Sequence, residues 1–272
     1  MTKSIVDIFV KLAKELPKEE TEPKETRWGG DVKLKPHQER VHRRLEKAPG
    51  VLVYHGLGSG KTITSITAGA HLGLNSEVAV PASLRNNYRK EIDKVQPRSG
   101  FNVNSYEGFS KHPDASGKLL IADEGQRLRD PASHRSVALQ AASHLANKRL
   151  ILSGTPIQNS PEELAPIMNT VAGKHILPVG ETFKQRFVQE KEVDPGFFAK
   201  LRGVKPGVEH AIKNENELAK TVRGLVDYHP SSKDGFPAKH VSHVDVEMDP
   251  RQKKVYETVT GRIPKSIFHK ME

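Results

Sequence analysis

The chain has 272 residues, enough for one large or two modest domains with a hydrophobic core. Its 43 Lys and Arg residues against 33 Asp and Glu residues give a formal charge of +10, which favours polyanionic partners such as nucleic acid. The absence of cysteine excludes disulfides and thiolate sites, and the absence of a long apolar run or a signal-peptide pattern leads us to expect no membrane span.

An amphipathic helix is predicted near the N-terminus. Apolar residues recur at helical spacing over residues 4–16, from Ile5 to Leu16, and Pro17 ends the pattern before a charged linker. This helix either packs on the main domain or binds a partner. We therefore expect residues 1–30 to form an N-terminal helix and linker.

From residue 34 onward, short β-type runs alternate with helical stretches. A helix is predicted over 36–47, because Pro36 suits a first helical turn and Pro49-Gly50 stops the helix. The pattern then predicts strands at 51–55, 77–81, 101–105, 118–123 and 149–153, and helices at 61–72, 83–95 and 133–146. Such alternation is typical of an α/β fold with a doubly wound, mostly parallel sheet and helices on both faces.

After residue 160 the pattern becomes mostly helical and predicts a helical insertion, with helices at 161–171, 181–190 and 214–226. A strand is predicted over 241–248, because Val244, Val246 and Met248 alternate with acidic residues. A last helix should follow, with Asp249 as its N-cap and Pro250 in its first turn.

The segment His55-Gly56-Leu57-Gly58-Ser59-Gly60-Lys61-Thr62 lies between a predicted strand and a predicted helix. Glycines allow a tight turn that aims backbone N–H groups at phosphate oxygens, and the helix N-terminus adds partial positive charge. Lys61 would reach the β- and γ-phosphates, and Thr62 would offer its hydroxyl to Mg²⁺. A Gly/Ser-rich turn that carries Lys-Thr by chance is the alternative. The segment predicts a phosphate-binding loop (P-loop) in which Gly58, Ser59, Gly60, Lys61 and Thr62 bind a nucleotide.

The predicted strand 118–123 ends in two carboxylates, Asp123 and Glu124. In parallel α/β folds, ligands bind at the carboxyl edge of the sheet. We expect Asp123 to hold Mg²⁺, directly or through water, and Glu124 to polarise the attacking water. Hydrolysis of a phosphoanhydride depends mainly on such positioning and charge neutralisation.

Further motifs follow in a recognisable order. The chain carries Leu34-Lys35-Pro36-His37-Gln38, the P-loop, Pro81-Ala82-Ser83-Leu84, Ser105-Tyr106-Glu107, Asp123-Glu124-Gly125-Gln126 and Ser153-Gly154-Thr155-Pro156-Ile157-Gln158-Asn159. This series resembles the N-terminal RecA-like lobe of superfamily-2 helicases, most closely the Swi/Snf-type DNA translocases. The resemblance implies a RecA-like ATP-binding lobe over residues 31–260. It also implies ATP and Mg²⁺ as cofactors, and ATP hydrolysis coupled to movement on double-stranded DNA.

The resemblance implies roles for individual residues as well. Gln38 would read the adenine, and catalysis would depend on Lys61, Asp123 and Glu124, with Thr62 and Asp123 at the metal. Gln126, Ser153 and Thr155 would couple the nucleotide state to the nucleic-acid surface. The predicted contacts to the nucleic-acid backbone are Ser83, Arg85, Ser105 and Tyr106.

Several features depart from the family pattern. Gln126 replaces the usual His, and Leu225-Val226-Asp227-Tyr228 stands in place of an Arg-rich stretch. His55 at the head of the P-loop is more similar to viral or phage members, which would act in the host cytoplasm; a eukaryotic member could be nuclear. Family members use a second RecA-like lobe, so we expect residues 261–272 to begin the link to that lobe, in a longer chain or in a separate one.

Other functions stay open. One alternative is an RNA helicase or a DNA-dependent ATPase acting in transcription, and another is a non-catalytic module that holds nucleotide or a partner. The 13 histidines show no spacing that indicates a zinc site. Two basic runs are either solvated or contact nucleic acid, and we favour contact for one of them: Lys33, Lys35, Arg40, Arg43, Arg44 and Lys47, or Arg251, Lys253, Lys254, Arg262, Lys265 and Lys270.

Overall fold

The computed structural model describes residues 5–14, 32–96, 98, 100–193, 207–231 and 241–261. Contacts within the chain divide it into two units, Met1–Ser232 and Lys233–Glu272. The expected lobe boundaries, residues 31–260, stay a prediction. No helix in the described ranges is long and apolar enough to cross a membrane.

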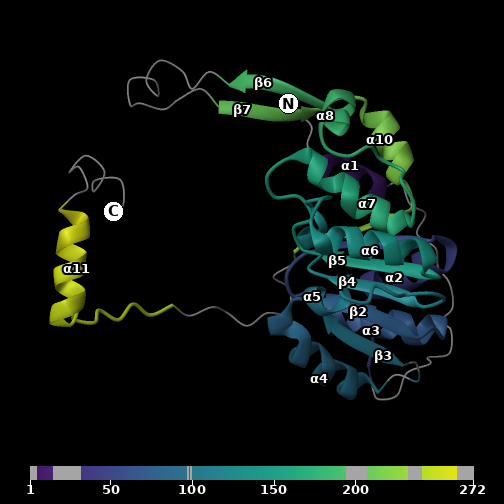
Figure 1. Cartoon of the computed structure of the whole chain (residues 1–272), viewed down its shortest axis with the longest axis horizontal. Helices are drawn as coiled ribbons and strands as arrows, with labels where there is room; N and C mark the ends of the chain where they lie inside the picture. Colours follow the sequence, from purple (N-terminus) through teal and green to yellow (C-terminus); the bar gives the residue numbers. More distant parts are fainter. Residues whose placement is uncertain are drawn as a thin grey trace. The chain divides into compact units, whose positions relative to one another are not determined.

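The first unit is built on a six-stranded parallel sheet with the strand order β3-β2-β4-β5-β1-β8 (Figure 1). The strands are β1 (Gly50–His55), β2 (Ser76–Val80), β3 (Phe101–Ser105), β4 (Leu119–Asp123), β5 (Lys148–Ser153) and β8 (Val226–His229). The predicted doubly wound α/β fold is therefore confirmed. Strand β8 was not predicted: its four residues are too short a pattern to be recognised without their pairing partner β1.

Helices cover both faces of the sheet, because successive strand residues point to opposite sides. In β4, Leu119 and Ile121 belong to one buried cluster and Leu120 and Ala122 to the other. Helices α6 and α7 lie on one side of the sheet and α3 and α4 on the other (Figure 1). The covering helices include α2 (Pro36–Lys47), α3 (Lys61–Leu72), α4 (Arg85–Val95), α5 (Tyr106–Phe109), α6 (His134–Leu145) and α7 (Leu164–Ala172).

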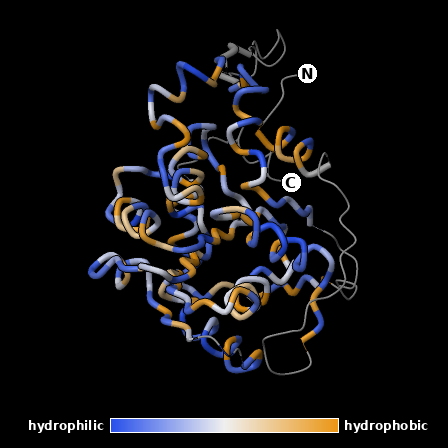
Figure 2. Tube along the Cα trace, turned by 90° about the vertical axis from the view of Figure 1, so that its right-hand side faces the viewer, coloured by the Kyte–Doolittle hydropathy of each residue, from blue (hydrophilic) through white to orange (hydrophobic). Residues whose placement is uncertain are grey.

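The N-terminal helix α1 (Ile5–Lys14) is part of this unit. Its apolar side chains Ile5, Ile8, Phe9 and Leu12 are buried in the core cluster that also holds Leu52 and Ile151, and the helix contacts β8. Hydrophobic and hydrophilic residues are interspersed along the helices (Figure 2), as expected where one helix face covers a sheet and the other faces solvent. The sequence left open whether this helix packs on the main domain or binds a partner, and in the structure it packs on the main domain.

The insertion after residue 160 contains helices and a β-hairpin. Helices α7, α8 (Glu181–Phe187) and α10 (Glu215–Val222) are joined by β6 (Val188–Val193) and β7 (Gly207–Ile212), which pair antiparallel. The prediction of helix over 181–190 is wrong after Phe187. Strand pairing with a segment that is distant in sequence decides the conformation there, and a local pattern does not contain that information.

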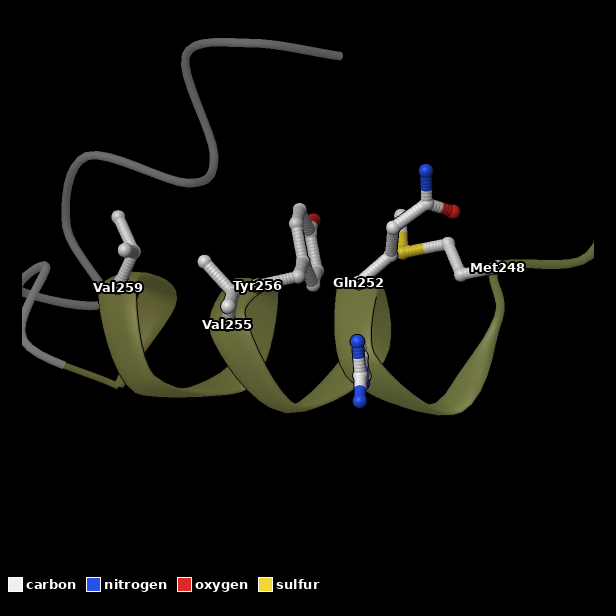
Figure 3. A pocket seen from close by; sticks show the side chains of 6 residues that line it. Met248, Gln252, Val255, Tyr256 and Val259 are labelled. Atoms are coloured by element: carbon white, nitrogen blue, oxygen red, sulfur yellow. The ribbon is translucent and has the colours of Figure 1, made fainter.

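In the second unit, residues 241–249 form no helix or strand, and helix α11 (Pro250–Thr260) follows. Asp249 caps this helix as predicted, accepting hydrogen bonds from the N–H groups of Arg251 (2.7 Å) and Gln252 (3.0 Å). Residues 241–249 pair with no other strand in the described part of the chain, although we predicted a strand there. Met248, Gln252, Val255, Tyr256 and Val259 point to one side of the helix and line a shallow groove (Figure 3).

Candidate nucleotide site

Three neighbouring strands bring the sequence motifs together. Strands β4, β5 and β1 are adjacent in the sheet, so their carboxyl ends meet at one edge. The P-loop follows β1, Asp123 ends β4 and Ser153 ends β5. A Cβ atom on Gly154 would lie 3.6 Å from the His55 carbonyl oxygen and 3.7 Å from Lys61 Nζ. The loop after β5 therefore lies directly against the P-loop.

The P-loop has the backbone geometry that its glycines allow. Gly58 and Gly60 have φ angles of 74° and 80°, in the left-handed region that side chains disfavour. Gly60 is the N-cap of α3, so this turn aims the first N–H groups of the helix at the sheet edge. The Oγ of Ser59 is buried and has no hydrogen-bond partner among the described residues. Phosphate oxygens would supply the missing acceptor, so the loop fits the group that it was predicted to bind.

Lys61 lies over this loop. Its Nζ donates to the carbonyl oxygens of His55 (3.0 Å) and Gly56 (3.1 Å). Burial lowers the pKa of Lys61, and the neighbouring carboxylates of Glu124 and Asp123 partly oppose that shift. The ammonium group is thus bonded to the P-loop backbone and feels the charge of both carboxylates.

Gln38 is buried against the P-loop. Its Nε2 donates to the Gly60 carbonyl (3.2 Å), and its Oε1 accepts from the Lys35 N–H (2.8 Å). A Cβ on Gly60 would lie 2.6 Å from Gln38 Nε2, so the glycine is needed for this approach. Gln38 thus lies beside the P-loop, with both amide atoms used within the protein. The adenine contact stays a prediction.

Asp123 and Glu124 form the acidic side of the site. Asp123 is buried, and burial followed by the nearby Glu124 carboxylate raises its pKa to about 6. The Glu124 N–H donates to Asp123 Oδ1 at 3.0 Å. Glu124 has a φ of 56°, a left-handed conformation that costs a non-glycine residue on the order of 1–3 kcal/mol. A buried carboxyl group at this edge is suited to a cation, and strained backbone of this kind clusters at functional sites.

Gln126 connects the acidic pair to the loop after β5. Its Nε2 donates to Glu124 Oε2 at 2.7 Å, and its Oε1 accepts from the Ser153 hydroxyl at 2.7 Å. Ser153 Oγ in turn accepts from the Thr155 N–H at 3.0 Å. Glu124, Gln126, Ser153 and Thr155 therefore form one continuous hydrogen-bonded chain. The glutamine that departs from the family pattern fits this chain, because its amide both donates to a carboxylate and accepts from a hydroxyl.

The predicted nucleic-acid contacts separate into two groups. Ser83 and Arg85 are exposed after β2, in η1 (Ala82–Leu84) and at the start of α4. Ser105 caps α5 by accepting from the Gly108 N–H at 3.0 Å. Tyr106 is fully buried, and its hydroxyl donates to the Asp123 carbonyl at 2.7 Å. The prediction of Tyr106 as a surface contact is therefore corrected: Tyr106 supports the acidic pair from inside the core.

Sequence reasoning missed a charged cluster under the P-loop. Asp227 of β8 is buried, forms ion pairs with Arg40 (2.8 Å) and Arg44 (2.9 Å) of α2, and accepts a hydrogen bond from His55 Nε2 (2.7 Å). The expectation that this basic run is either solvated or bound to nucleic acid is thus wrong for Arg44, which is mostly buried, whereas Arg40 pairs with Asp227 and stays partly exposed. An acidic residue inside the apolar run Leu225–Tyr228 was the signal that could have indicated the pairing, but its partners are distant in sequence.

These residues suit ATP and Mg²⁺. A glycine-rich loop at a helix N-terminus, a lysine above it and a buried carboxyl group opposite are the groups that hold nucleotide phosphates. Mg²⁺ in such sites takes one or two protein ligands, and phosphates and water complete its shell. No cluster of three or more His, Asp or Glu side chains in the described ranges could hold a metal by itself. Asp123 and Thr62 are the residues that would hold Mg²⁺ together with phosphates.

The parallel sheet and the motifs at its carboxyl edge define a RecA-like α/β domain. Residues 79–272 match the family described as the SNF2-related domain. The chain belongs to the SNF2-related domain family.

Individual relatives agree with this assignment. A putative ATP-dependent RNA helicase of Acanthamoeba polyphaga mimivirus is 26% identical over 258 residues, which is 78% of this chain and 43% of the relative. A termination factor NPH-I homolog of African swine fever virus is 27% identical over 246 residues, 78% of this chain and 33% of that protein. The chain thus spans less than half the length of these relatives.

A solved structure supports the fold. The Sulfolobus solfataricus SWI2/SNF2 ATPase core in complex with dsDNA superposes with a TM-score of 0.58 at 18% identity. The match covers 79% of this chain and 47% of that one. At this level of identity the likeness shows the RecA-like fold, and nothing about the substrate follows from it alone.

Proposed function

We propose that this lobe binds ATP with Mg²⁺ and hydrolyses it as part of a motor that moves along double-stranded DNA. The observation that carries the proposal is the meeting of three strand ends, which joins the P-loop, the acidic pair and the Ser153–Thr155 loop at one edge. Hydrogen bonds from Glu124 through Gln126 and Ser153 to Thr155 connect the proposed nucleotide site to the protein surface.

Each residue has a role in this proposal. Lys61 binds the β- and γ-phosphates, and Asp123 and Thr62 hold the metal. When bound, Mg²⁺ neutralises charge on the phosphates. Glu124 orients and polarises the attacking water. Its side chain is fixed by the Gln126 amide at 2.7 Å, so the carboxylate faces the site in a defined orientation before nucleotide binds.

Coupling to nucleic acid would run through the Glu124–Gln126–Ser153–Thr155 chain. Thr155 is exposed at the end of this chain, so a change at Glu124 can reach the surface through hydrogen bonds alone. Ser83 and Arg85 are exposed after β2, a neighbour of β4, and are the proposed contacts to the phosphodiester backbone. The basic composition of the chain supports a polyanionic partner.

A second RecA-like lobe, in the same longer protein or in another chain, completes the proposed motor. The relatives are more than twice as long as the matched region. In the second unit, the apolar side of α11 is exposed, with Val255 and Val259 more than half accessible. The viral relatives support a viral or phage origin, with the host cytoplasm as the place of action.

A second candidate function is a nucleic-acid-dependent ATPase acting in transcription, which the similarity to a termination factor favours. ATPase assays with duplex DNA, with RNA and with neither separate the candidates. Stimulation by duplex DNA supports the translocase, and stimulation by RNA alone supports an RNA helicase. Nucleotide binding without turnover, in a protein that includes the second lobe, would leave only a binding module.

A further inference from the structure

Both ends of the P-loop are held by histidine side chains. At the start of the loop, His55 Nε2 donates to Asp227 Oδ1 at 2.7 Å. Near its end, His37 Nε2 donates to the Ser59 carbonyl oxygen at 2.9 Å. The glycines between these points permit many backbone conformations, so the loop itself does not determine its shape. Contacts from outside the loop must do so.

The two histidines belong to one packed group. The His37 ring stacks on His229 with centroids 4.0 Å apart and planes 7° apart, and it meets His55 edge-on at 5.3 Å. His55 also meets His229 at 5.6 Å. The rings of residues from α2, β1 and β8 therefore pack against one another next to the P-loop.

Asp227 is the anchor of this group. Its side chain is completely buried, which is tolerable for a carboxylate only when charged partners surround it. Arg40 binds both carboxylate oxygens at 2.8 Å, and Arg44 Nε binds Oδ2 at 2.9 Å. These partners outweigh burial and lower the pKa of Asp227 to about 2, so the carboxylate is ionised. Burial lowers the pKa of His55, which favours a neutral ring whose Nε2–H donates a hydrogen bond to Asp227.

The end of β8 also holds the first glycine of the loop. The Gly56 N–H donates to the His229 carbonyl oxygen at 2.9 Å. A Cβ on Gly56 would collide with both the backbone and the side chain of Ser231. The segment that leaves β8 therefore lies directly across the start of the P-loop.

We propose that Asp227 is a positioning residue for nucleotide binding. Asp227 holds His55, on which His37 and His229 pack, and His55 in turn holds the P-loop in its phosphate-binding shape. Asp227 does not touch the nucleotide. It connects α2 and β8 to the loop, so both elements determine the affinity for ATP. This inference rests on the proposed nucleotide-binding function and gives Asp227 a role that no sequence motif indicated.

A purely structural role is the competing explanation. A buried ion pair can set stability alone, in which case variants lower the fraction of folded protein and leave the affinity of each folded molecule unchanged. Glu77 provides a matched control. It is a buried acid at the start of β2, paired with Lys118 at 2.7 Å and Asn102 at 2.9 Å, at the opposite edge of the sheet from the P-loop.

The experiment measures the ATP dissociation constant of the 272-residue chain by calorimetry, alongside its urea unfolding curve. His55→Leu removes the donor to Asp227 and leaves the ion pairs to Arg40 and Arg44. His55→Gln places an amide N–H where the imidazole N–H was. We expect His55→Leu to weaken ATP binding per folded molecule about tenfold, the value of one hydrogen bond to a charged group. His55→Gln should recover most of that loss, within about threefold of the unmodified chain.

The control and a third variant complete the test. Glu77→Gln should lose stability without a change in ATP affinity, and Asp227→Asn should weaken ATP binding at least as much as His55→Leu. Should Asp227→Asn not fold, the two His55 variants decide by themselves. Equal ATP affinity for His55→Leu and the unmodified chain overturns the inference and leaves the proposed function intact. An unmodified, folded chain without measurable ATP binding overturns the proposed function and this inference with it.

Discussion

Lys61 is the side chain whose removal tests the phosphate site most directly. In the structure its Nζ donates to the carbonyl oxygens of His55 and Gly56. Binding to the β- and γ-phosphates therefore exchanges two contacts with neutral oxygens for contacts with charged ones. Hydrogen bonds that involve a charged group contribute about 1.5–3 kcal/mol each. Only the difference between the two states reaches the affinity, so we expect a net loss of about 1.5–2 kcal/mol for Lys61→Ala, or ten- to thirtyfold.

The same substitution also removes the two hydrogen bonds from Lys61 Nζ to carbonyl oxygens of the P-loop segment. Stability should fall by about 1–2 kcal/mol, because the ammonium group is only half-buried and water partly replaces its bonds. The assay is therefore calorimetry with ATP and Mg²⁺ on a variant whose folding is verified by urea unfolding. Lys61→Met keeps the apolar stem and serves as the control for packing. An unchanged ATP dissociation constant for both folded variants would refute the assignment of the phosphate site.

Further predictions concern the acidic pair, acid stability, salt and turnover. In the two-lobe protein, Glu124→Gln should bind ATP with Mg²⁺ and hydrolyse it at least 100-fold more slowly, whereas Asp123→Asn should reduce the Mg²⁺ dependence of binding; normal turnover in both would place catalysis elsewhere. Burial, with the His71 ring beside it, lowers the pKa of His42 to about 4. The unfolded chain takes up this proton below about pH 6.5 and the folded chain only near pH 4. The free energy of unfolding should therefore decrease by up to about 3 kcal/mol as the pH is lowered from about 6.5 to 4. In urea unfolding, the stability of His42→Gln should decrease less over this pH range than that of the unmodified chain. An equal decrease in both proteins would contradict the assignment to His42. Affinity for duplex DNA should decrease steeply with salt and show little base preference, and a salt-independent or strongly sequence-specific dissociation constant would count against backbone binding. Finally, the 272-residue chain alone should hydrolyse ATP slowly, because Arg127 and Arg129 lie on its own lobe and Arg129 is engaged with Gln158; an arginine from a second lobe typically adds about 10³–10⁵ in rate. DNA-stimulated turnover that is fast and independent of protein concentration would disprove this.

Much of the site could be predicted from the sequence, because its features are local. A P-loop is a run of glycines that ends in Lys61 and Thr62 between a strand and a helix, and each part has a residue signature. Asp123 and Glu124 follow an apolar strand, so their place at the sheet edge follows from chain direction alone. The helices α2 and α3 begin and end where their proline, glycine and charge signals indicate. The N-cap of α11 at Asp249 is of the same kind.

The tertiary structure decided the features that depend on pairs of residues far apart in the chain. Gln126 reads as a departure from the family in the sequence, but folding places its amide between Glu124 and Ser153. Tyr106 resembles a surface contact, but it begins helix α5 after the edge strand β3, and folding buries it with its hydroxyl donating to the Asp123 carbonyl.

The same holds for the cluster under the P-loop. Arg40 and Arg44 look solvated on a basic helix until strand β8 brings Asp227 beneath them. Composition and periodicity report what each residue prefers locally. The ion pairs of Asp227 and its hydrogen bond with His55 form only when β8 pairs with β1. That pairing brings together residues more than a hundred positions apart in the chain.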